Sequence, residues 1–279
     1  MLEKLFYGEN LLLLFWTSLV VFFVVFECGF RTGRGQRSRI DETAKSWIAI
    51  IDGAVLGIFG IVLAFSFAMA QERFQARKQL VVEEANAIGT TYLRAQWLPE
   101  PHRTDVSTLL RRYVDVRLPN DLQSRNVEDV VQEVVVLSEQ LHNQLWLHAV
   151  EIAKKGSASP VIALFLATLN DMIDLNTKRL AAFQNQVPEI ILLLLYGLAA
   201  FTLLITGYGC GFSNRRNVLA TFPLIGLLAL FLFVIVDLDR PGRGLIKVSQ
   251  QSMIRLQQQL HSNMAAPEAK REHSGGRSH

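Results

Sequence analysis

The residue types best suited to chemistry are few and lie at separate points of the chain. Glu139 and His142 have the Glu-x-x-His spacing that di-iron sites use in helical bundles. Such a site needs a second Glu-x-x-His and two further carboxylates, and the sequence does not repeat the motif. It also has no phosphate-binding glycine loop and no nucleophile elbow. We therefore interpret Glu139 and His142 as helix-surface residues, and we expect no metal, no cofactor and no enzymatic reaction.

Three aspartates lie at the edges of strongly apolar segments, where a charge is costly and often functional. Asp52 is the deepest, about one turn inside such a segment. It lines a polar pathway, lies at headgroup depth or bonds a neighbouring helix. Asp237 and Asp239 open a compact charged turn that continues to residue 244. They either form an ion-paired turn or contribute to a site for a hard cation such as calcium, which would need more oxygen ligands.

A third patch combines small and polar residues at helical spacing, between residues 83 and 94. It contains Glu84, Asn86, Gly89 and Arg94, with Gly89 one turn after Ala85. Small residues let helices approach closely, and the polar groups can bond across the contact. The patch is typical of a close helix contact and would equally suit a subunit interface.

Four charge-free runs supply the elements that must position these residues. They cover residues 10–26, 53–71, 190–214 and 217–236. Each is close to the roughly 20 residues that cross a hydrocarbon core of about 30 Å. Mean hydropathy is positive and 19% of the residues are charged, which is low for a soluble chain. The sequence predicts an all-α integral membrane protein with four transmembrane helices.

The second of these helices differs from the others. Gly53 and Gly57 begin a strip of small residues that Gly60, Ala64 and Ala68 continue, so another helix can approach closely. No proline interrupts the chain until Pro99, and a single glycine lies between residues 71 and 97. We therefore expect one long helix that continues far beyond the bilayer.

The remaining segments follow from breakers and periodicity. Residues 1–70 hold helices one and two with a basic, glycine-containing loop at 29–46. Residues 71–187 form a helical-bundle domain inserted between helices two and three. Residues 188–237 hold helices three and four. Residues 238–264 form a turn and a helix, which we place at about 245–262, and residues 265–279 read as a disordered tail.

Membrane orientation rests on the lysines and arginines near the helix ends. The two short loops carry seven, and the opposite face carries nine. The positive-inside rule therefore gives a slight preference for cytoplasmic termini and a cytoplasmic domain.

Several of these segments together resemble the bestrophin-like domain family of mostly bacterial membrane proteins. The resemblance lies in residues 57–60 with 65–68, residues 84–90 with 92–94, and residues 237–241 with 244–246, and it covers about residues 48–260. It implies a multi-pass protein of the bacterial inner membrane. The family has no settled activity.

The family name points to the bestrophins, pentameric anion channels with four spans and a helical domain between spans two and three. In them the second helix lines the pore with apolar side chains at a narrow neck. The corresponding residues here are Ile58, Ile61, Val62 and Phe65, which could gate by dewetting. No bestrophin pore or calcium-clasp motif matches position by position, so the resemblance carries over neither anion selectivity nor calcium gating.

These features give three hypotheses for function. The first is an oligomeric, bestrophin-like ion channel lined by the second helix, with the bilayer, other copies of the chain (five by resemblance) and an inorganic ion as partners. The second is a non-conducting membrane scaffold or sensor whose helical domain binds a protein. A small transporter is the third. No nucleic acid is expected as a partner.

Overall fold

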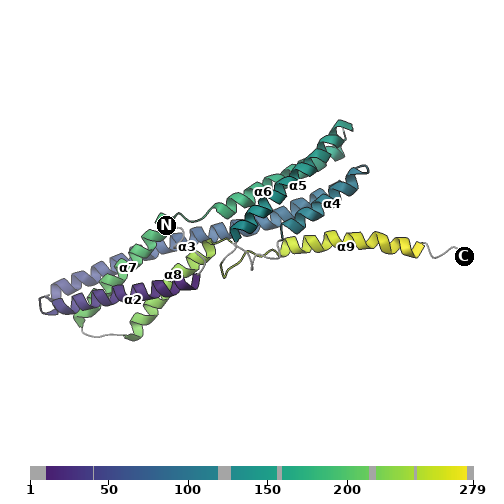
Figure 1. Cartoon of the computed structure of the whole chain (residues 1–279). Coiled ribbons are helices and arrows are strands. Elements are labelled where there is room, and N and C mark those ends of the chain that lie inside the picture. Colours follow the sequence, from purple (N-terminus) through teal and green to yellow (C-terminus); the bar gives the residue numbers. More distant parts are fainter. Residues whose placement is uncertain are drawn as a thin grey trace. The chain divides into compact units, whose positions relative to one another are not determined.

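The structure is a computed structural model, which describes residues 11–39, 41–118, 127–155, 159–213, 218–241 and 244–274. These residues form helices and no strand. The elements are α2 (Leu11–Gln36), the 3-10 turn η1 (Arg37–Arg39), α3 (Glu42–Ala95), α4 (His102–Val116), α5 (Val127–Lys155), α6 (Pro160–Gln184), α7 (Glu189–Ser213), α8 (Val218–Asp239) and α9 (Gln251–Ser274) (Figure 1).

The helices divide between two compact units. The first, here called the membrane unit, comprises Met1–Gln75 and Asn185–Lys247. The second, here called the helical domain, comprises Ala76–Gln184 and Val248–His279. The sequence predicted domain limits at 71 and 187, and it did not indicate that α9 belongs with α4, α5 and α6.

Four helices among the described residues are long and apolar enough to cross a membrane. Their apolar segments lie in α2, α3, α7 and α8, as the sequence predicted. The prediction of one unbroken second helix is also confirmed, because α3 runs for 54 residues. The Asp41 carboxylate accepts a hydrogen bond from the Ala44 amide at 2.8 Å and caps its start.

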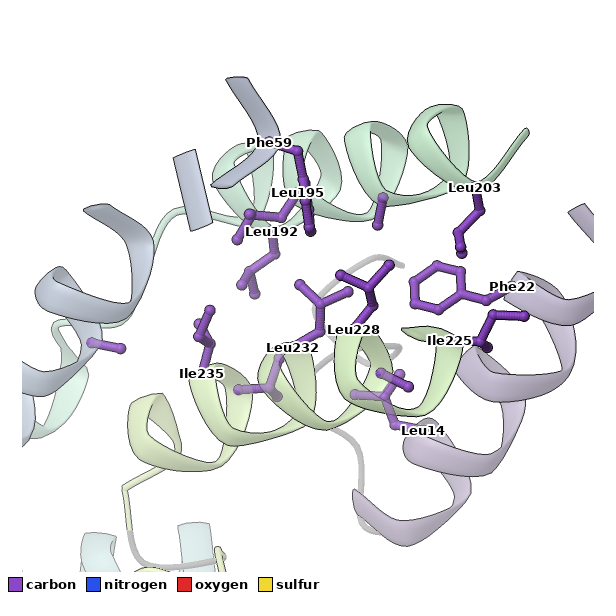
Figure 2. Close-up of a cluster of buried hydrophobic side chains, with 14 of the residues drawn as sticks. Leu14, Phe22, Phe59, Leu192, Leu195, Leu203, Ile225, Leu228, Leu232 and Ile235 are labelled. Atoms are coloured by element: carbon purple, nitrogen blue, oxygen red, sulfur yellow. The ribbon is translucent and has the colours of Figure 1, made fainter. Parts of the chain in front are cut away.

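The membrane unit is closed by apolar side chains from all four spans. Figure 2 shows Leu14 and Phe22, with Phe59, Leu195 and Leu228, converging on one cluster. Phe22 and Phe59 are almost completely buried in it.

One prediction for this unit was wrong, because residues 29–36 and 42–46 of the predicted loop are helical. Glycines let α2 continue here. A methyl group at Gly29 would overlap the carbonyl oxygen of Leu204, and one at Gly33 would overlap that of Tyr208. On α7, Gly207 and Gly211 meet the carbonyls of α2 residues in the same way. The two backbones therefore pack in direct contact, which helix propensity alone would not suggest.

The helical domain has its own core of buried residues from α3, α4, α5, α6 and α9. Helix α9 starts at Gln251, later than predicted. The amides of residues 245 and 246 donate hydrogen bonds to an α8 side chain, so these residues do not begin the helix. Helix α9 also continues to Ser274, so the prediction of a disordered tail is wrong for residues 265–274. Residues 275–279 lie outside the described residues. Leu256 and Leu260 of α9 are buried in the domain core.

Candidate functional site

The most exposed apolar surface of the membrane unit lies on α3. Only 6% of the residues in its apolar segment are buried, against 28% in that of α2, 33% in that containing α7 and 44% in that of α8. Ile58, Ile61 and Phe65 are 56%, 60% and 71% exposed. Their three- and four-residue spacing places them on one face of the helix. Among the residues that the structure describes, little packs against this face.

The fourth residue proposed for this face lies elsewhere. Val62 is half-buried and packs against the core of the membrane unit, where Phe59 is buried. Ser66 is buried one turn further and donates to the Val62 carbonyl at 2.8 Å. The exposed face therefore consists of Ile58, Ile61 and Phe65, and Val62 belongs to the side that holds α3 to its own subunit.

The small residues of α3 form a second exposed strip. A methyl group at Gly53, Gly57 or Gly60 would meet no atom within 4 Å. At 100° per residue the strip lies roughly a quarter-turn from the Ile58–Phe65 face. Unlike Gly29, Gly33, Gly207 and Gly211, these glycines have no described helix packed against them.

Asp52 lies on the inward side of α3 and is half-buried. The hydroxyl of Thr206 on α7 donates to its carboxylate at 2.7 Å. Of the three interpretations of this aspartate, the structure shows the bond to a neighbouring helix. The contact adds a polar link between α3 and α7 inside a mainly apolar unit.

Asp237 and Asp239 are fully buried at the end of α8. The two carboxylate oxygens of Asp237 accept hydrogen bonds from the backbone amides of Leu245 and Ile246, at 2.7 and 2.9 Å. Asp239 accepts one from the Val187 amide at 2.8 Å. The aspartates thus fix the connectors on either side of α7 and α8, which satisfies backbone donors that would otherwise be costly to bury. Gly244 is required here, because a methyl group would overlap the Asp237 carboxylate.

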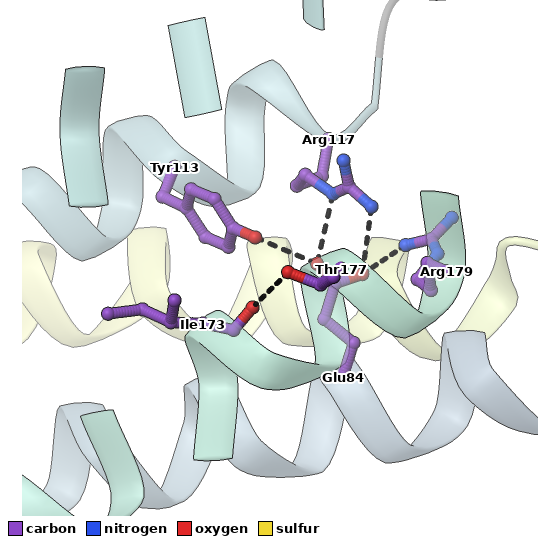
Figure 3. A network of polar contacts seen from close by, with 6 residues as sticks. All are labelled: Glu84, Tyr113, Arg117, Ile173, Thr177 and Arg179. Carbon is purple, nitrogen blue, oxygen red and sulfur yellow. Dashed lines mark hydrogen bonds and ion pairs between the residues drawn. The ribbon is translucent and has the colours of Figure 1, made fainter. Parts of the chain in front are cut away.

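In the helical domain, Glu84 is the centre of a buried polar cluster (Figure 3). Its side chain has no exposed surface. Tyr113 of α4 donates to it at 2.9 Å, the Nε of Arg117 lies 3.0 Å from it, and Arg179 of α6 forms a second ion pair. The sequence placed Glu84 at a close helix contact or a subunit interface. Because the Glu84 side chain is fully buried, it stabilises the contact between α3, α4 and α6 and has no surface with which to contact a second copy of the chain.

Charge in this cluster is unbalanced, with two arginines and one carboxylate. Burial alone would raise the pKa of Glu84, but Arg117 and Arg179 outweigh it and lower the pKa below its ordinary value. Burial and the neighbouring Glu84 raise the pKa of Tyr113 well above 10.0. Glu84 is therefore a carboxylate and Tyr113 a neutral donor at neutral pH.

The rest of the predicted patch divides between interior and surface. Gly89 is half-buried, and a methyl group there would lie 3.4 Å from the Leu256 side chain. Arg94 donates to the Leu164 carbonyl of α6 at 2.7 Å. Asn86 is exposed and lines an open hollow with Glu83, Asp171 and Lys178.

The interpretation of His142 as a surface residue was wrong. It is buried, and its ring lies 4.9 Å from that of Tyr113, centroid to centroid. Glu139, one turn earlier, is exposed as expected. Among the residues the structure describes, no three histidine, cysteine or acidic side chains gather as a metal site would require.

Several residues of these contacts were missed by sequence reasoning. The Gly29–Gly33 and Gly207–Gly211 pairs carry a detectable signal, the four-residue spacing of small residues. Tyr113, Arg117 and Arg179 carry none, because nothing local shows that arginines on two helices share one carboxylate on a third.

The fold and these contacts define an all-helical, multi-pass membrane protein with four apolar spans and a helical domain. The chain belongs to the Bestrophin-like domain family, whose model matches residues 12–253. Among solved structures it is similar to a bacterial bestrophin homolog from Klebsiella pneumoniae carrying one tyrosine-to-alanine substitution. The TM-score is 0.61 at 13% identity, covering 88% of this chain and 96% of that one. That likeness supports the fold. A search of curated proteins gave no match.

Proposed function

We propose that the protein is a homo-oligomeric ion channel of the inner membrane in which α3 of each subunit lines the pore. One observation carries the proposal: the Ile58–Phe65 face of α3 is exposed along an apolar span that is barely buried in its own subunit. Four spans enclose little space in one subunit, so a pore requires several copies around an axis. The family resemblance favours five.

The strip at Gly53 and Gly57 supports assembly through α3. In the membrane unit, glycines on α2 and α7 bring two helix backbones into contact, whereas these two glycines meet nothing. Close helix approach at small residues is a principal source of association in lipid, where apolar side chains gain nothing by leaving the bilayer. A neighbouring copy against this strip would leave the Ile58–Phe65 face toward the axis.

The chemistry of the face fits a hydrophobic constriction. Ile58, Ile61 and Phe65 offer no polar atom to a passing ion, so a narrow ring of them would conduct only when wide enough to stay hydrated. Asp52 points to the other side of α3, toward Thr206. We therefore propose the ring as a gate and leave ion selectivity unassigned.

Flux through purified protein in liposomes tests the proposal. Phe65→Ala removes the largest side chain of the face and is expected to raise ion flux several-fold, because the constriction widens. Phe201→Ala is the matched control: Phe201 of α7 is 51% exposed and lies outside this face. No flux from wild type or Phe65→Ala, or a protein that is monomeric in native-like membranes by mass measurement, would contradict the channel.

For topology, we propose that both termini and the helical domain are cytoplasmic. The small excess of lysine and arginine on that face supports this orientation.

A second candidate, a non-conducting scaffold or sensor, draws on a different observation. The helical domain exposes Leu93, Trp97 and Leu147 at 64%, 63% and 65%. Exposed large apolar side chains often mark a protein interface. Ion flux that responds to Phe65→Ala would exclude the scaffold, and an inert protein that binds a partner through these residues would favour it.

A further inference from the structure

Helix α4 contacts every histidine whose side chain the structure describes. His102 is its first residue, and His142 and His148 reach the helix from α5. His261 reaches it from α9. Histidine is the side chain whose charge ordinarily changes between pH 5 and 8. The contacts of α4 therefore include imidazoles from α4 itself, from α5 and from α9.

The first contact joins two imidazoles directly. The Nδ1 atoms of His102 and His148 are 3.1 Å apart, and the rings meet edge to face. At this distance one proton can lie between the two nitrogens as a hydrogen bond. A proton added at an outer Nε2 leaves this hydrogen bond in place, but protonation of both rings would bring two N–H groups and two positive charges against each other. His102 is also buried at the N-terminus of α4, where the helix dipole disfavours a cation.

The charged residues next to this pair along α4 and α5 are exposed or already paired. Along α4, Arg103 forms an ion pair with Glu100 at 2.6 Å, and Asp105 is exposed. Along α5, Glu151 is exposed. The turn after α3 contributes a neutral group, Gln96, which donates to Ser107 at 3.0 Å.

The second contact places His142 beside an excess of positive charge. Arg117 of α4 and Arg179 of α6 share one carboxylate, Glu84 of α3, and His142 lies against Tyr113 in the same cluster. Burial first and Arg117 second lower the pKa of His142 from 6.5 to about 4. The unfolded chain binds this proton at higher pH than the folded chain does. The stability that neutral His142 supports is thus complete above about pH 6.5 and falls as pH drops toward 4.

The third contact pairs a histidine with a carboxylate instead of with another imidazole, and it provides an internal control. The Nε2 of His261 lies 3.2 Å from the Asp115 carboxylate, and both side chains are about half exposed. A carboxylate therefore faces His261, whereas the Nδ1 of His102 faces another imidazole. A positive charge on the histidine suits the contact of α4 with α9 but not the contact between the two imidazoles.

We propose that the contacts of α4 with α5, made through His102, His142 and His148, form an acid-sensitive latch that opens the helical domain at mildly acidic pH. On opening, the buried face of α4 becomes exposed while α9 remains in contact with Asp115. The latch resides wholly in the helical domain and holds whether or not the protein conducts ions.

Hydrogen exchange of the full-length protein in lipid nanodiscs tests the latch, with labelling times scaled for the intrinsic effect of pH. Between pH 7.5 and 5.5, amides of α4 and α5 are expected to lose protection, while α7 and α8 stay unchanged. Linkage gives roughly ten-fold for each suppressed proton per pH unit below the ordinary histidine pKa of about 6.5. At pH 5.5 Glu84 is still ionised, so its own titration does not contribute.

Two variants separate the contacts. His148→Asn keeps a neutral partner for His102 and is expected to reduce the loss of protection by roughly ten-fold. His261→Asn should leave the loss as large as in wild type, or larger. If His148→Asn does not fold, His102→Asn serves in its place. Unchanged protection of α4 in wild type at pH 5.5 would overturn the latch, and so would variants at the histidine pair that respond to acid as wild type does.

Discussion

The helices of the two units are held together by different kinds of contact. In the membrane unit, helices α2 and α7 meet at glycines and an apolar cluster fills the remaining space (Figure 2). In the helical domain, a buried carboxylate joins three helices through two arginines and a tyrosine (Figure 3). Glycine contacts suit the membrane unit, since burying apolar groups stabilises helices in water but not in lipid. The helical domain has its own apolar core beside the charged cluster.

The comparison has a practical consequence. A contact made by backbone approach carries no charge and is insensitive to pH, whereas one made by ionised groups depends on every charge in it. The contacts between α3, α4 and α6 should therefore depend on protonation, whereas the contact between α2 and α7 should be sensitive to side-chain size. Substitutions in each unit test this distinction.

The largest effect is expected from Glu84→Ala. It leaves Arg117 and Arg179 buried without their carboxylate, which should cost about 3–5 kcal/mol of domain stability. Chemical unfolding of the detergent-purified protein measures the loss. Glu83→Ala, at the exposed neighbouring position, is the control and should remain near wild type. An equal, small effect of both variants would show that the cluster does not hold the domain.

A smaller loss is expected from Gly207→Ala in the membrane unit. The new methyl group would overlap the Phe26 carbonyl oxygen, so α2 and α7 must separate, at about 1–3 kcal/mol. Gly57→Ala is the matched change on α3, where a methyl group meets nothing and subunit stability should be unaltered. Thermal unfolding in detergent compares the two. Equal tolerance of both changes would mean that backbone contact does not close this unit.

The smallest effect concerns the polar link inside the membrane unit. Thr206→Val removes the hydroxyl that bonds Asp52 and should cost about 0.6 kcal/mol, the usual size of such bonds in lipid. Asp52→Asn can still accept the bond and should stay closer to wild type in stability. If Asp52 instead lines an ion pathway, Asp52→Asn would change flux or its pH dependence while assembly stays intact.

The spans and the long α3 were predictable because their causes are local. Charge-free runs of the right length predict membrane crossing, and the lack of proline before Pro99 predicts an unbroken helix. The continuation of α2 through Gly29 and Gly33 was not predictable from propensity, since those glycines are stable in a helix only with α7 against them.

The candidate site was predicted in part. Helical spacing correctly grouped Ile58, Ile61 and Phe65, but it could not show that Val62 turns toward the core, since the neighbours of α3 decide that. The sequence singled out Asp237 and Asp239 because a charge near a membrane is energetically costly. It could not predict that they bind the backbone amides of distant residues. His142 was misplaced because its partner, Tyr113, lies on another helix.

The bond between Asp239 and the Val187 amide has a consequence for biosynthesis. The two residues are separated by the whole of α7 and α8, so the start of α7 cannot be secured until α8 has left the ribosome. The Asp237 bonds require residues 245 and 246 as well. In a nascent chain halted before that point, the spans could lie in the bilayer, but the Asp237 and Asp239 hydrogen bonds could not form. The membrane unit therefore makes its last hydrogen bonds late in translation.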